Sequence, residues 1–585
     1  MPSVPTIHYI LSAPDPRTHY FHVQIYFEGD LEPDFRLALP AWSPGSYLIR
    51  EYARHVINLK ARTDDRDLKV SRVDKACWSL TLPFCTRELW VDYDVFSYEM
   101  TVRSNYLDKE YGLVSPTATF MYQPERKGVP VRLTVEAPRG WDVATGLLQD
   151  GPDREYQAAN YDELVDAPIQ LGCLYRYPFD VGGVVHEVVV AGPSADQLPQ
   201  PSFLEDLSRI ITAANNLFGG LPYSNYVFLV TLTENGGGGL EHLNSANIMV
   251  PRHRWHNKKD YPKILSLFSH EFFHLWNVKR LHPAQFGPFD YQSEVYTSVL
   301  WVLEGFTDYF AYWLLGQSQV VAENELLTHW ADAFKQYEEL PGRWVTPIAD
   351  ASRESWIRQY RPDSNTPNIT VSYYVKGALV GLLLDLELRR HTRGQVTLAT
   401  IMRTLWNRYG ERGYPERAVE DLIIELGGSW MSEYLDHYIH GVTPLDESVL
   451  DVVGLVLRRD FKEEEGARPL WLGVSVMDRH GRLFARPVDR GGPAESGGLS
   501  PDDEIVAING ERILTVDQWN GSLTRLSPGV PIAVVVSHHG RLDTLSLMPE
   551  LPRPDNYRLV VVDEPSDGQR KAFQEWLGTK LPQQP

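Results

Sequence analysis

Two histidines frame the most informative stretch of the chain, His270-Glu271-Phe272-Phe273-His274. Residues four apart lie on the same face of a helix, so His270 and His274 can offer two imidazoles to one tetrahedral zinc ion. Glu271 then lies beside the water that the ion would activate. The surrounding sequence favours a helix, because neither proline nor glycine occurs from Ile264 to Leu281. The plainer interpretation is a chance pair of histidines on a buried aromatic helix.

A catalytic zinc ion needs a third protein ligand, and two glutamates further along the chain compete for that place. Glu304 is favoured over Glu294 because it lies in the apolar, helix-like run from Ser298 to Leu315, which suits burial. Asp308 follows one helical turn later on the same face. Its carboxylate can accept the free N–H of a ligand histidine and fix the tautomer of that ring. Glu294 is expected to be a solvated residue near a helix start.

Another carboxylate, Glu241, follows a glycine tract. Tyr226 to Thr233 predicts a strand, and Gly238 and Gly239 come shortly after it. These glycines let a peptide backbone approach closely. Glu241 can then pair with the free α-amino group of a substrate, the contact by which an exopeptidase recognises a chain end. The plainer interpretation of this segment is a flexible loop.

A tyrosine pair opens a further predicted helix at Tyr373-Tyr374-Val375-Lys376-Gly377-Ala378. The hydroxyl of Tyr374 can donate a hydrogen bond to the oxyanion of a tetrahedral intermediate. Taken alone, Tyr374 is better interpreted as a core aromatic residue, because the chain contains 30 tyrosines. The oxyanion role is favoured only through the resemblance given below.

The elements that must position these residues change in character along the chain. Alternating apolar residues predict an antiparallel β domain over residues 1–175. Helical periodicity dominates the catalytic region, 176–457, and a charged linker is expected at 458–468. Short strands return at 469–552, and 553–585 is expected as a C-terminal tail with a short helix from Ser566 to Leu577. The helices predicted in the catalytic region are Phe203 to Leu217, Lys263 to Lys279, Ser298 to Leu315, Tyr373 to Arg389 and Ala418 to Leu426.

Composition limits the kind of partner. A chain of 585 residues is too long for a single hydrophobic core. Its 56 Lys and Arg residues against 77 Asp and Glu residues give a net charge of −21, which argues against nucleic acid or an anionic membrane as partner. The first residues show no basic segment followed by an apolar one, so no signal peptide is predicted. Without a membrane-spanning stretch either, the expected location is the cytoplasm.

Three cysteines are too few for a disulfide framework or a cysteine-based zinc site. Cys77 and Cys85 are close enough in sequence to pair across a hairpin. Free, buried thiols are the favoured interpretation of both. The cysteines therefore contribute nothing to the predicted metal site.

Taken together, the motifs resemble the glycyl aminopeptidase family, a gluzincin branch similar to the larger aminopeptidase N family. His270 to Arg280 closely matches its zinc helix, and Glu304-Gly305-Phe306-Thr307 resembles the segment that carries the third ligand in both families. Tyr374 to Gly377 resembles Tyr-Glu-Lys-Gly, whose tyrosine stabilises the oxyanion. Pro40 to Tyr47 is similar to a signature of the family's N-terminal region. The distance from His274 to Glu304 departs from the aminopeptidase N spacing, which implies an insertion.

The glycine tract adds to this resemblance. Gly238 to His242 looks like the Gly-x-Met-Glu-Asn exopeptidase motif, with Leu240 and His242 as substitutions. The match implies that Glu241 binds the substrate amine. Because His242 replaces the asparagine of that motif, the geometry of the contact between Glu241 and the substrate amine does not follow from the resemblance.

The C-terminal region resembles a PDZ domain of the bacterial protease type. Leu472, Gly473 and Val474 match its carboxylate-binding loop, and Gln518 to Leu526 matches the groove helix. Backbone N–H groups of this loop would meet a terminal carboxylate beside a strand edge that accepts an extra strand. A C-terminal peptide is the expected ligand. The alternative is a PDZ fold that only packs on the catalytic domain, and the sequence leaves both open.

The sequence thus predicts a multidomain α+β protein with an N-terminal antiparallel β domain. A thermolysin-like zinc-peptidase domain with a helical continuation and a C-terminal PDZ domain follow. The resemblance implies one Zn²⁺ per chain on His270, His274 and Glu304, with Glu271 as base and Tyr374 as oxyanion donor. It also implies peptide substrates with a free N-terminus and small N-terminal residues, glycine or alanine.

Two alternatives stay open at this stage. One is a zinc endopeptidase whose PDZ domain recruits substrates, and the other is a non-catalytic peptide-binding scaffold. N-terminally acetylated peptides separate the first alternative from an aminopeptidase, because an aminopeptidase rejects them.

Overall fold

The computed structural model of the chain describes residues 6–151, 154–462 and 467–583. The chain divides into two compact units. The first consists of Met1–Thr297, Phe310–Val321 and Ala399–Asp421, and the second of Ser298–Tyr309, Ala322–Leu398 and Leu422–Pro585. None of the helices in the described ranges has both the length and the apolar character that a membrane span requires.

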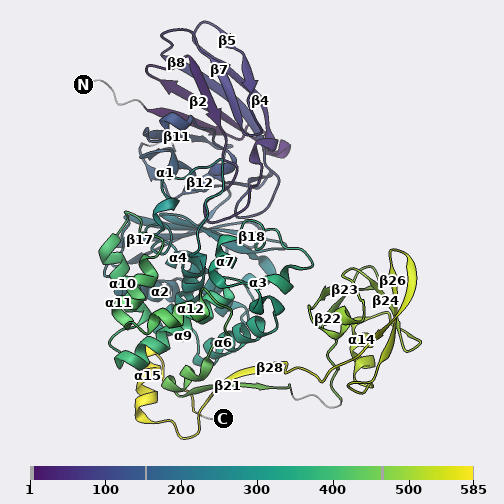
Figure 1. The fold of residues 1–585 in the computed structure, drawn as a ribbon. Coiled ribbons are helices and arrows are strands. Elements are labelled where there is room, and N and C mark those ends of the chain that lie inside the picture. Colours follow the sequence, from purple (N-terminus) through teal and green to yellow (C-terminus); the bar gives the residue numbers. More distant parts are fainter. Residues whose placement is uncertain (1–5, 152–153, 463–466, 584–585) are drawn as a thin grey trace. The chain divides into compact units, whose positions relative to one another are not determined.

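The N-terminal region is built from β-sheets, as predicted. Its largest sheet has the strand order β13-β14-β11-β1-β2-β8-β4-β5, and β2, β8 and β4 run side by side in it (Figure 1). Neighbouring strands are antiparallel except β1 and β11, which pair in parallel because a long crossover separates them in the sequence. The strands are β1 (Ile7–Ser12), β2 (Tyr20–Glu28), β4 (Val56–Arg62), β5 (Asp67–Leu68), β8 (Glu88–Phe96), β11 (Val131–Glu136), β13 (Leu148–Gln149) and β14 (Glu155–Ala158).

Two smaller sheets complete this region. One has the order β12-β15-β10-β9 and the other β3-β7-β6. Their strands are β3 (Asp34–Ala38), β6 (Val70–Arg72), β7 (Cys77–Thr81), β9 (Tyr106–Leu107), β10 (Tyr111–Val114), β12 (Asp142–Thr145) and β15 (Ile169–Gly172). All three cysteines lie in described ranges and carry free thiols. Cys77 is half-buried on β7 and Cys85 is exposed in a turn, so the prediction of two buried thiols is wrong.

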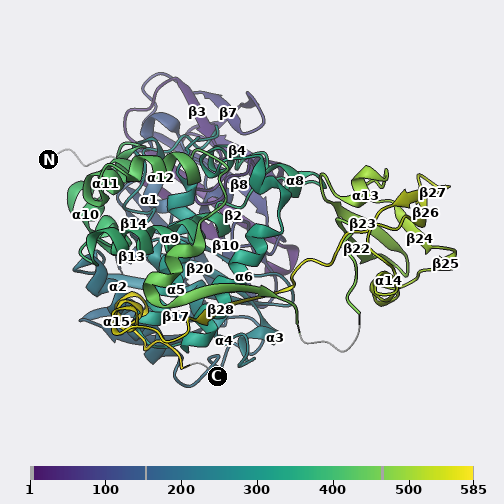
Figure 2. The ribbon, with the colours of Figure 1, turned by 60° about the horizontal axis from the view of Figure 1, so that its bottom comes forward.

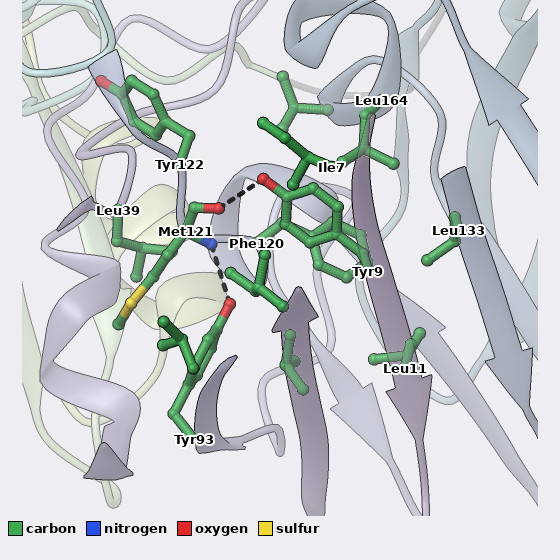
Figure 3. Packing of buried hydrophobic residues seen from close by; sticks show 14 of the residues in the cluster. Ile7, Tyr9, Leu11, Leu39, Tyr93, Phe120, Met121, Tyr122, Leu133 and Leu164 are labelled. Atoms are coloured by element: carbon green, nitrogen blue, oxygen red, sulfur yellow. Dashed lines mark hydrogen bonds between the residues drawn. The ribbon is translucent and has the colours of Figure 1, made fainter. Parts of the chain in front are cut away.

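Buried tyrosines tie the core of the N-terminal region together. The Tyr9 hydroxyl donates to the carbonyl of Met121 (2.8 Å), and the Met121 amide donates to the hydroxyl of Tyr93 (2.9 Å; Figure 3). The Tyr161 hydroxyl, on helix α1 (Tyr161–Val165), donates to the carbonyl of Phe120. The hydrogen bond of Tyr161 thus fixes α1 to the core of the N-terminal region.

A second sheet, with the order β16-β17-β18-β20-β19, carries the glycine tract and Glu241. The predicted strand at Tyr226 to Thr233 is confirmed as β18 (Asn225–Thr233). Gly238–Glu241 is a strand, β19, rather than a flexible loop; it pairs antiparallel with β20 and lies at one end of the sheet among the described residues. The remaining strands are β16 (Tyr175–Val181), β17 (Val184–Ala191) and β20 (Ser245–Pro251), and the helices beside them are α2 (Phe203–Phe218), α3 (Arg252–Trp255) and α4 (Tyr261–Phe273).

Helix α4 carries the two histidines but ends earlier than predicted. The sequence predicts a helix to Lys279, whereas α4 ends at Phe273 with His274 as its cap. The His274 amide still donates to the His270 carbonyl, and the chain then continues in turns. In these turns the Lys279 amide donates to the His274 carbonyl at 3.0 Å. No proline or glycine stands at this end of the helix. The helix ends because the side chains that follow it make contacts elsewhere in the chain, as described below.

The helical continuation begins with the Glu304 segment. The predicted helix at Ser298 to Leu315 is a π-helix over Trp301–Phe306 followed by α5 (Thr307–Gln317). A Cβ atom added to Gly305 would lie 2.5 Å from the Cα of Gly377, so this segment crosses α9 at close range. The other helices are α6 (Glu323–Glu338), α7 (Ile348–Arg353), α8 (Thr366–Ile369), α9 (Val375–Thr392), α10 (Leu398–Tyr409), α11 (Ala418–Gly427) and α12 (Met431–Tyr438).

The C-terminal region contains a small β domain of PDZ type, with the strand order β22-β23-β24-β26-β27 and helix α14 beside it (Figure 2). Its elements are β22 (Val474–Asp478), β23 (Leu483–Val488), α13 (Pro493–Ser496), β24 (Glu504–Ile508), β25 (Glu511–Arg512), α14 (Val516–Leu523), β26 (Ile532–His538) and β27 (Arg541–Leu547). The predicted α+β fold class is thereby confirmed.

The segments that flank the PDZ domain pair with each other. Strand β21 (Leu455–Asp460) runs antiparallel to β28 (Asn556–Val561), so the expected linker at 458–468 begins inside a strand. Residues 463–466 of that linker lie outside the described residues. The predicted C-terminal helix is confirmed as α15 (Asp567–Leu577).

Candidate active site

The two histidines of α4 present their ring nitrogens to each other. The Nε2 atoms of His270 and His274 lie 3.0 Å apart. The Nδ1 of His274 lies 2.8 Å from the main-chain carbonyl of Asn277, which can only accept a hydrogen bond. Nδ1 therefore carries the proton, and Nε2 of His274 keeps its lone pair. This is the tautomer that a metal ligand needs.

A buried carboxylate completes this pair. One ligand atom from each of His270, His274 and Glu304 lies within 4.8 Å of the others. Glu304 is buried, whereas Glu294 is exposed and belongs to no such group among the described residues. Two imidazoles and one carboxylate form the donor set that catalytic zinc uses while keeping a further position for water. The residues present thus fit zinc.

Glu271 lies against the edge strand β19. A Cβ atom at Gly239 would lie 2.1 Å from Oε1 of Glu271, so only glycine leaves room for this carboxylate. The sequence assigned Gly238 and Gly239 to the substrate backbone. Gly238 has open space around its Cα and a φ of +132°, whereas Gly239 is needed to seat Glu271. The two positions therefore require glycine for different reasons: Gly238 for its positive φ, and Gly239 for the space that it leaves to Glu271.

Glu241, the last residue of β19, is the third buried carboxylate here, after Glu304 and Glu271. Its carboxylate lies within 4.8 Å of the ligand atoms of Glu271 and His274. A Cβ atom at Gly45, whose φ is +84°, would lie 2.4 Å from Oε1 of Glu241. Glu241 is 5% exposed, and among the described residues no side chain or amide forms a hydrogen bond or ion pair with its carboxylate. A carboxylate in this position calls for a cationic ligand, because burying a lone charge is costly.

His242, the substitution in the exopeptidase motif, is directed towards Asp166. Its Nδ1 lies 3.3 Å from Oδ1 of Asp166, which also receives the Lys279 ammonium at 2.5 Å. The Leu243 amide donates to the other carboxylate oxygen at 2.7 Å. Burial raises the pKa of Asp166, but the Lys279 charge and the contact with His242 lower it by more, so the pKa lies below its ordinary value. Asp166 therefore stays ionised.

Arg280 fixes the turns after α4. Its guanidinium donates to the carbonyls of Leu243 (2.9 Å) and Leu275 (3.1 Å) and to Glu411 (3.1 Å). Together with the Lys279–Asp166 pair, Arg280 joins the segment after His274 to the loop after Glu241. These contacts explain why α4 ends at Phe273. They also fix the distance between the two histidines and the strand that carries Glu241.

Tyr374 lies where α9 begins, beside the Glu304 segment. Burial raises the pKa of the Tyr374 hydroxyl well above its ordinary value, and the Glu304 charge and a hydrogen bond with Tyr360 raise it further. Tyr373 stacks on Tyr374 with ring centroids 4.9 Å apart. Tyr374 is therefore protonated at neutral pH and can act as a hydrogen-bond donor.

Comparisons with known proteins agree with this site. Family models match over residues 8–173 (Peptidase M61 N-terminal domain), 263–380 (M61 glycyl aminopeptidase) and 484–527 (PDZ domain). A solved aminopeptidase N family protein from Idiomarina loihiensis is 30% identical, with a TM-score of 0.90 over 98% of this chain and 100% of that chain. The chain belongs to the M61 glycyl aminopeptidase family. As a member of this family it is a zinc metallopeptidase.

More distant matches show the fold or a part of it. A two-domain M1 zinc metallopeptidase solved with L-arginine is 15% identical to the M61 chain, with a TM-score of 0.50 over 76% of this chain and 96% of that one. A Neisseria meningitidis protein provisionally named a zinc metalloprotease is 33% identical over 87 residues. The M61 chain spans only 19% of the length of that curated relative.

The PDZ loop named from the sequence is partly engaged within its own domain. The Asp489 amide donates to the Gly473 carbonyl (2.7 Å), and the Ala494 amide donates to the Leu472 carbonyl (2.9 Å). Val474 begins β22, which lies at one end of the PDZ sheet among the described residues. The PDZ domain also contacts α8, where Asn368 donates to the Val488 carbonyl and accepts from the Arg490 amide, each at 2.9 Å.

Sequence reasoning missed three residues that shape the M61 site. The Asn277 carbonyl orients His274. Gly45 makes room for Glu241, and Asp166 binds His242 and Lys279. Only Gly45 carried a signal, because it lies inside the Pro40 to Tyr47 signature. A main-chain carbonyl leaves no trace in residue type.

Proposed function

We propose that this M61 protein is an aminopeptidase that removes single residues from the free N-terminus of peptides. The observation that supports this most directly is Glu241, a buried carboxylate with no partner among the described residues, whose oxygen lies within 4.8 Å of the ligand atoms of Glu271 and His274. An α-ammonium group bound to Glu241 lies close enough to the metal site for the first peptide bond to be the one attacked.

The chain's own residues divide the chemistry among them. His270, His274 and Glu304 hold the metal, and Asp308 is proposed to orient His270. Bound zinc supplies Lewis-acid activation of the attacking water and the scissile carbonyl. Glu271 takes the proton from that water and delivers it to the leaving amine.

Tyr374 has a separate role. It donates a hydrogen bond to the developing oxyanion, a role for which its raised pKa keeps it protonated. Glu241 contributes no proton transfer in this scheme and only fixes the substrate amine.

The substrate backbone lies along β19 in this proposal. An extended peptide can add to the free side of an edge strand through main-chain hydrogen bonds. Gly238 leaves open space beside that strand, so a substrate chain can approach it. We further propose the preference for small N-terminal residues, glycine or alanine, that the family resemblance implies.

For the PDZ domain we propose a C-terminal peptide ligand at the loop Leu472 to Val474, beside the edge of β22. Recruitment of substrates through this domain is not needed for the proposed reaction. The endopeptidase alternative has no observation in its favour that compares with Glu241.

A paired peptide assay tests the proposed function. One peptide with a free N-terminal alanine and the same peptide with an acetylated N-terminus are incubated with the zinc-loaded protein, and products are identified by mass spectrometry. We expect stepwise loss of single residues from the free peptide and none from the acetylated one. Cleavage of both peptides at internal bonds would refute the proposal. Removal of zinc with a chelator is the control, and it should stop the reaction until zinc is restored.

A further inference from the structure

The beginning of β19 borders a pocket of about 370 Å³. Its wall comes from the glycine tract, the end of β20, helix α3 and the first turns of α4. Gly238 belongs to this wall, so the pocket adjoins the strand along which the substrate is proposed to lie. Its wall also includes Gly236, Gly237, Arg254, Lys263 and Leu267.

One side of α4 leads from the proposed base to this pocket. Lys263, Leu267 and Glu271 follow one another at intervals of four residues and therefore lie on the same side of the helix. At about 1.5 Å of rise per residue, Leu267 lies about 6 Å and Lys263 about 12 Å from Glu271 along the helix axis. Glu271 lies against Gly239, whereas Leu267 and Lys263 line the pocket together with Gly238. The helix and the strand thus border one path from the base to the pocket.

This pocket carries positive charge although the chain as a whole is acidic. Residues 252–263 include five Lys or Arg residues and one Asp, whereas the net charge of the chain is −21. Arg254 and Lys263 line the pocket, are exposed, and form no ion pair or side-chain hydrogen bond among the described residues. Asp260, also in the wall, accepts a hydrogen bond from the side-chain amide of Asn257 at 2.7 Å. The pocket therefore offers two cations to an anionic group.

The direction of the substrate follows from the proposed function, on which this inference rests. With its amine on Glu241, at the end of β19, a peptide along this strand runs towards Gly238 and is antiparallel to the strand. Extended residues span about 3.4 Å each, so the third and fourth residues of the peptide reach the level of Gly238. We propose that Arg254 and Lys263 bind a carboxylate carried by the third or fourth residue of the substrate.

This carboxylate has two possible sources. It is either the C-terminus of a tripeptide or tetrapeptide, or the side chain of an acidic residue at the same place in a longer peptide. Exposed ion pairs are individually weak and are screened by salt. Two of them together should raise kcat/KM by about three- to thirtyfold at low ionic strength, and by less at high salt.

Two pairs of peptides test this on the zinc-loaded full chain, with release of the N-terminal alanine as the measured reaction. The first pair is trialanine with a free C-terminus and trialanine amide. The second pair is Ala-Ala-Glu-Ala amide and Ala-Ala-Gln-Ala amide. We expect the peptide with the carboxylate to be cleaved faster in at least one pair. A preference within the first pair identifies the C-terminus as the source, and one within the second pair identifies the acidic side chain.

Variants locate the preference in the pocket. The double variant Arg254→Gln, Lys263→Gln should reduce the advantage of the carboxylate to less than about twofold. Lys258→Gln, Lys259→Gln is the matched control, because it removes the same charge from exposed residues of the same segment that do not line the pocket. This control should keep the advantage.

The outcomes separate this inference from the proposed function. Equal cleavage within both pairs, or an advantage that survives in the Arg254 and Lys263 variant, overturns the inference and leaves the aminopeptidase proposal standing. An equal loss of the advantage in the Lys258 and Lys259 control also overturns it, because the charge of the whole segment would then suffice. Equal cleavage of free and N-acetylated trialanine, or no release of alanine from any free-amine peptide, refutes the proposed function itself.

Discussion

Replacing Glu241 with glutamine exchanges a buried carboxylate for a carboxamide of the same shape. The carboxylate lies in a site that is 5% exposed, beside Gly45 and within 4.8 Å of the ligand atoms of Glu271 and His274. Truncating one partner of a buried charge pair typically costs about 2–4 kcal/mol. At about 1.4 kcal/mol for each factor of ten, kcat/KM on alanine anilide should fall roughly thirty- to a thousandfold.

The same substitution should leave the fold intact or make it more stable. Among the described residues no group compensates the Glu241 charge, so its removal relieves a desolvation cost without breaking a contact. We therefore expect Glu241→Gln to melt at or above the temperature of the unmodified protein and to keep its zinc. Glu234→Gln is the matched control, because Glu234 is exposed in the loop before β19.

The assay compares alanine anilide with its acetylated form in the unmodified protein, Glu241→Gln and Glu234→Gln. Hydrolysis of the acetylated form, already slow, should barely change in any of them. Equal losses on the two substrates, or loss of zinc or stability in Glu241→Gln, would mean that Glu241 supports the metal site or the fold. The endopeptidase alternative would then lead.

Three further predictions concern the metal, the base and the fold. Glu304→Ala should bind zinc weakly, whereas Glu294→Ala should keep a full equivalent by metal analysis; the reverse pattern would make Glu294 the ligand. Gly239→Ala places a Cβ where Glu271 lies and should lower kcat by about a hundredfold or more with zinc retained, while Gly220→Ala, in open space, should not; equal activity of the two would contradict the seating of Glu271. Burial lowers the pKa of His186 to about 4, so on acidification the unfolded chain takes up a proton on this imidazole before the folded chain does. The contribution of neutral His186 to the free energy of unfolding is therefore complete above about pH 6.5. It is lost as the pH falls to about 4, by up to about 3 kcal/mol. Urea unfolding of the zinc-free protein between pH 7 and 5 should show a smaller loss in His186→Phe, and an unchanged loss would assign it to other groups.

The parts of the site that the sequence predicts are those fixed by local spacing. The separation of His270 and His274 on one helical face follows from helix geometry alone. The residue at which that helix ends does not follow from local spacing. It depends on contacts of Arg280 and Lys279 with Glu411, Asp166 and main-chain carbonyls far away in the sequence. A prediction from helix propensity therefore continues α4 to Lys279, six residues beyond its end at Phe273.

Contacts between distant segments explain the other differences. The close packing of Gly45 on Glu241 and the crossing of Gly305 with Gly377 depend on backbones meeting at short range. Residue types in a single sequence do not record which glycines meet. The π-helix at Trp301–Phe306 is likewise set by what packs around it, since its apolar residues suit an α-helix equally well.

Zinc content and turnover of Glu271→Gln test the central claim most directly. Glu271 seats its carboxylate against Gly239 beside the two histidines and is assigned as the base rather than as a ligand. A carboxamide cannot take a proton from water, so the variant should keep one zinc per chain by metal analysis and lose turnover of alanine anilide by at least about a hundredfold. Loss of zinc, or near-normal turnover with zinc present, would contradict the account.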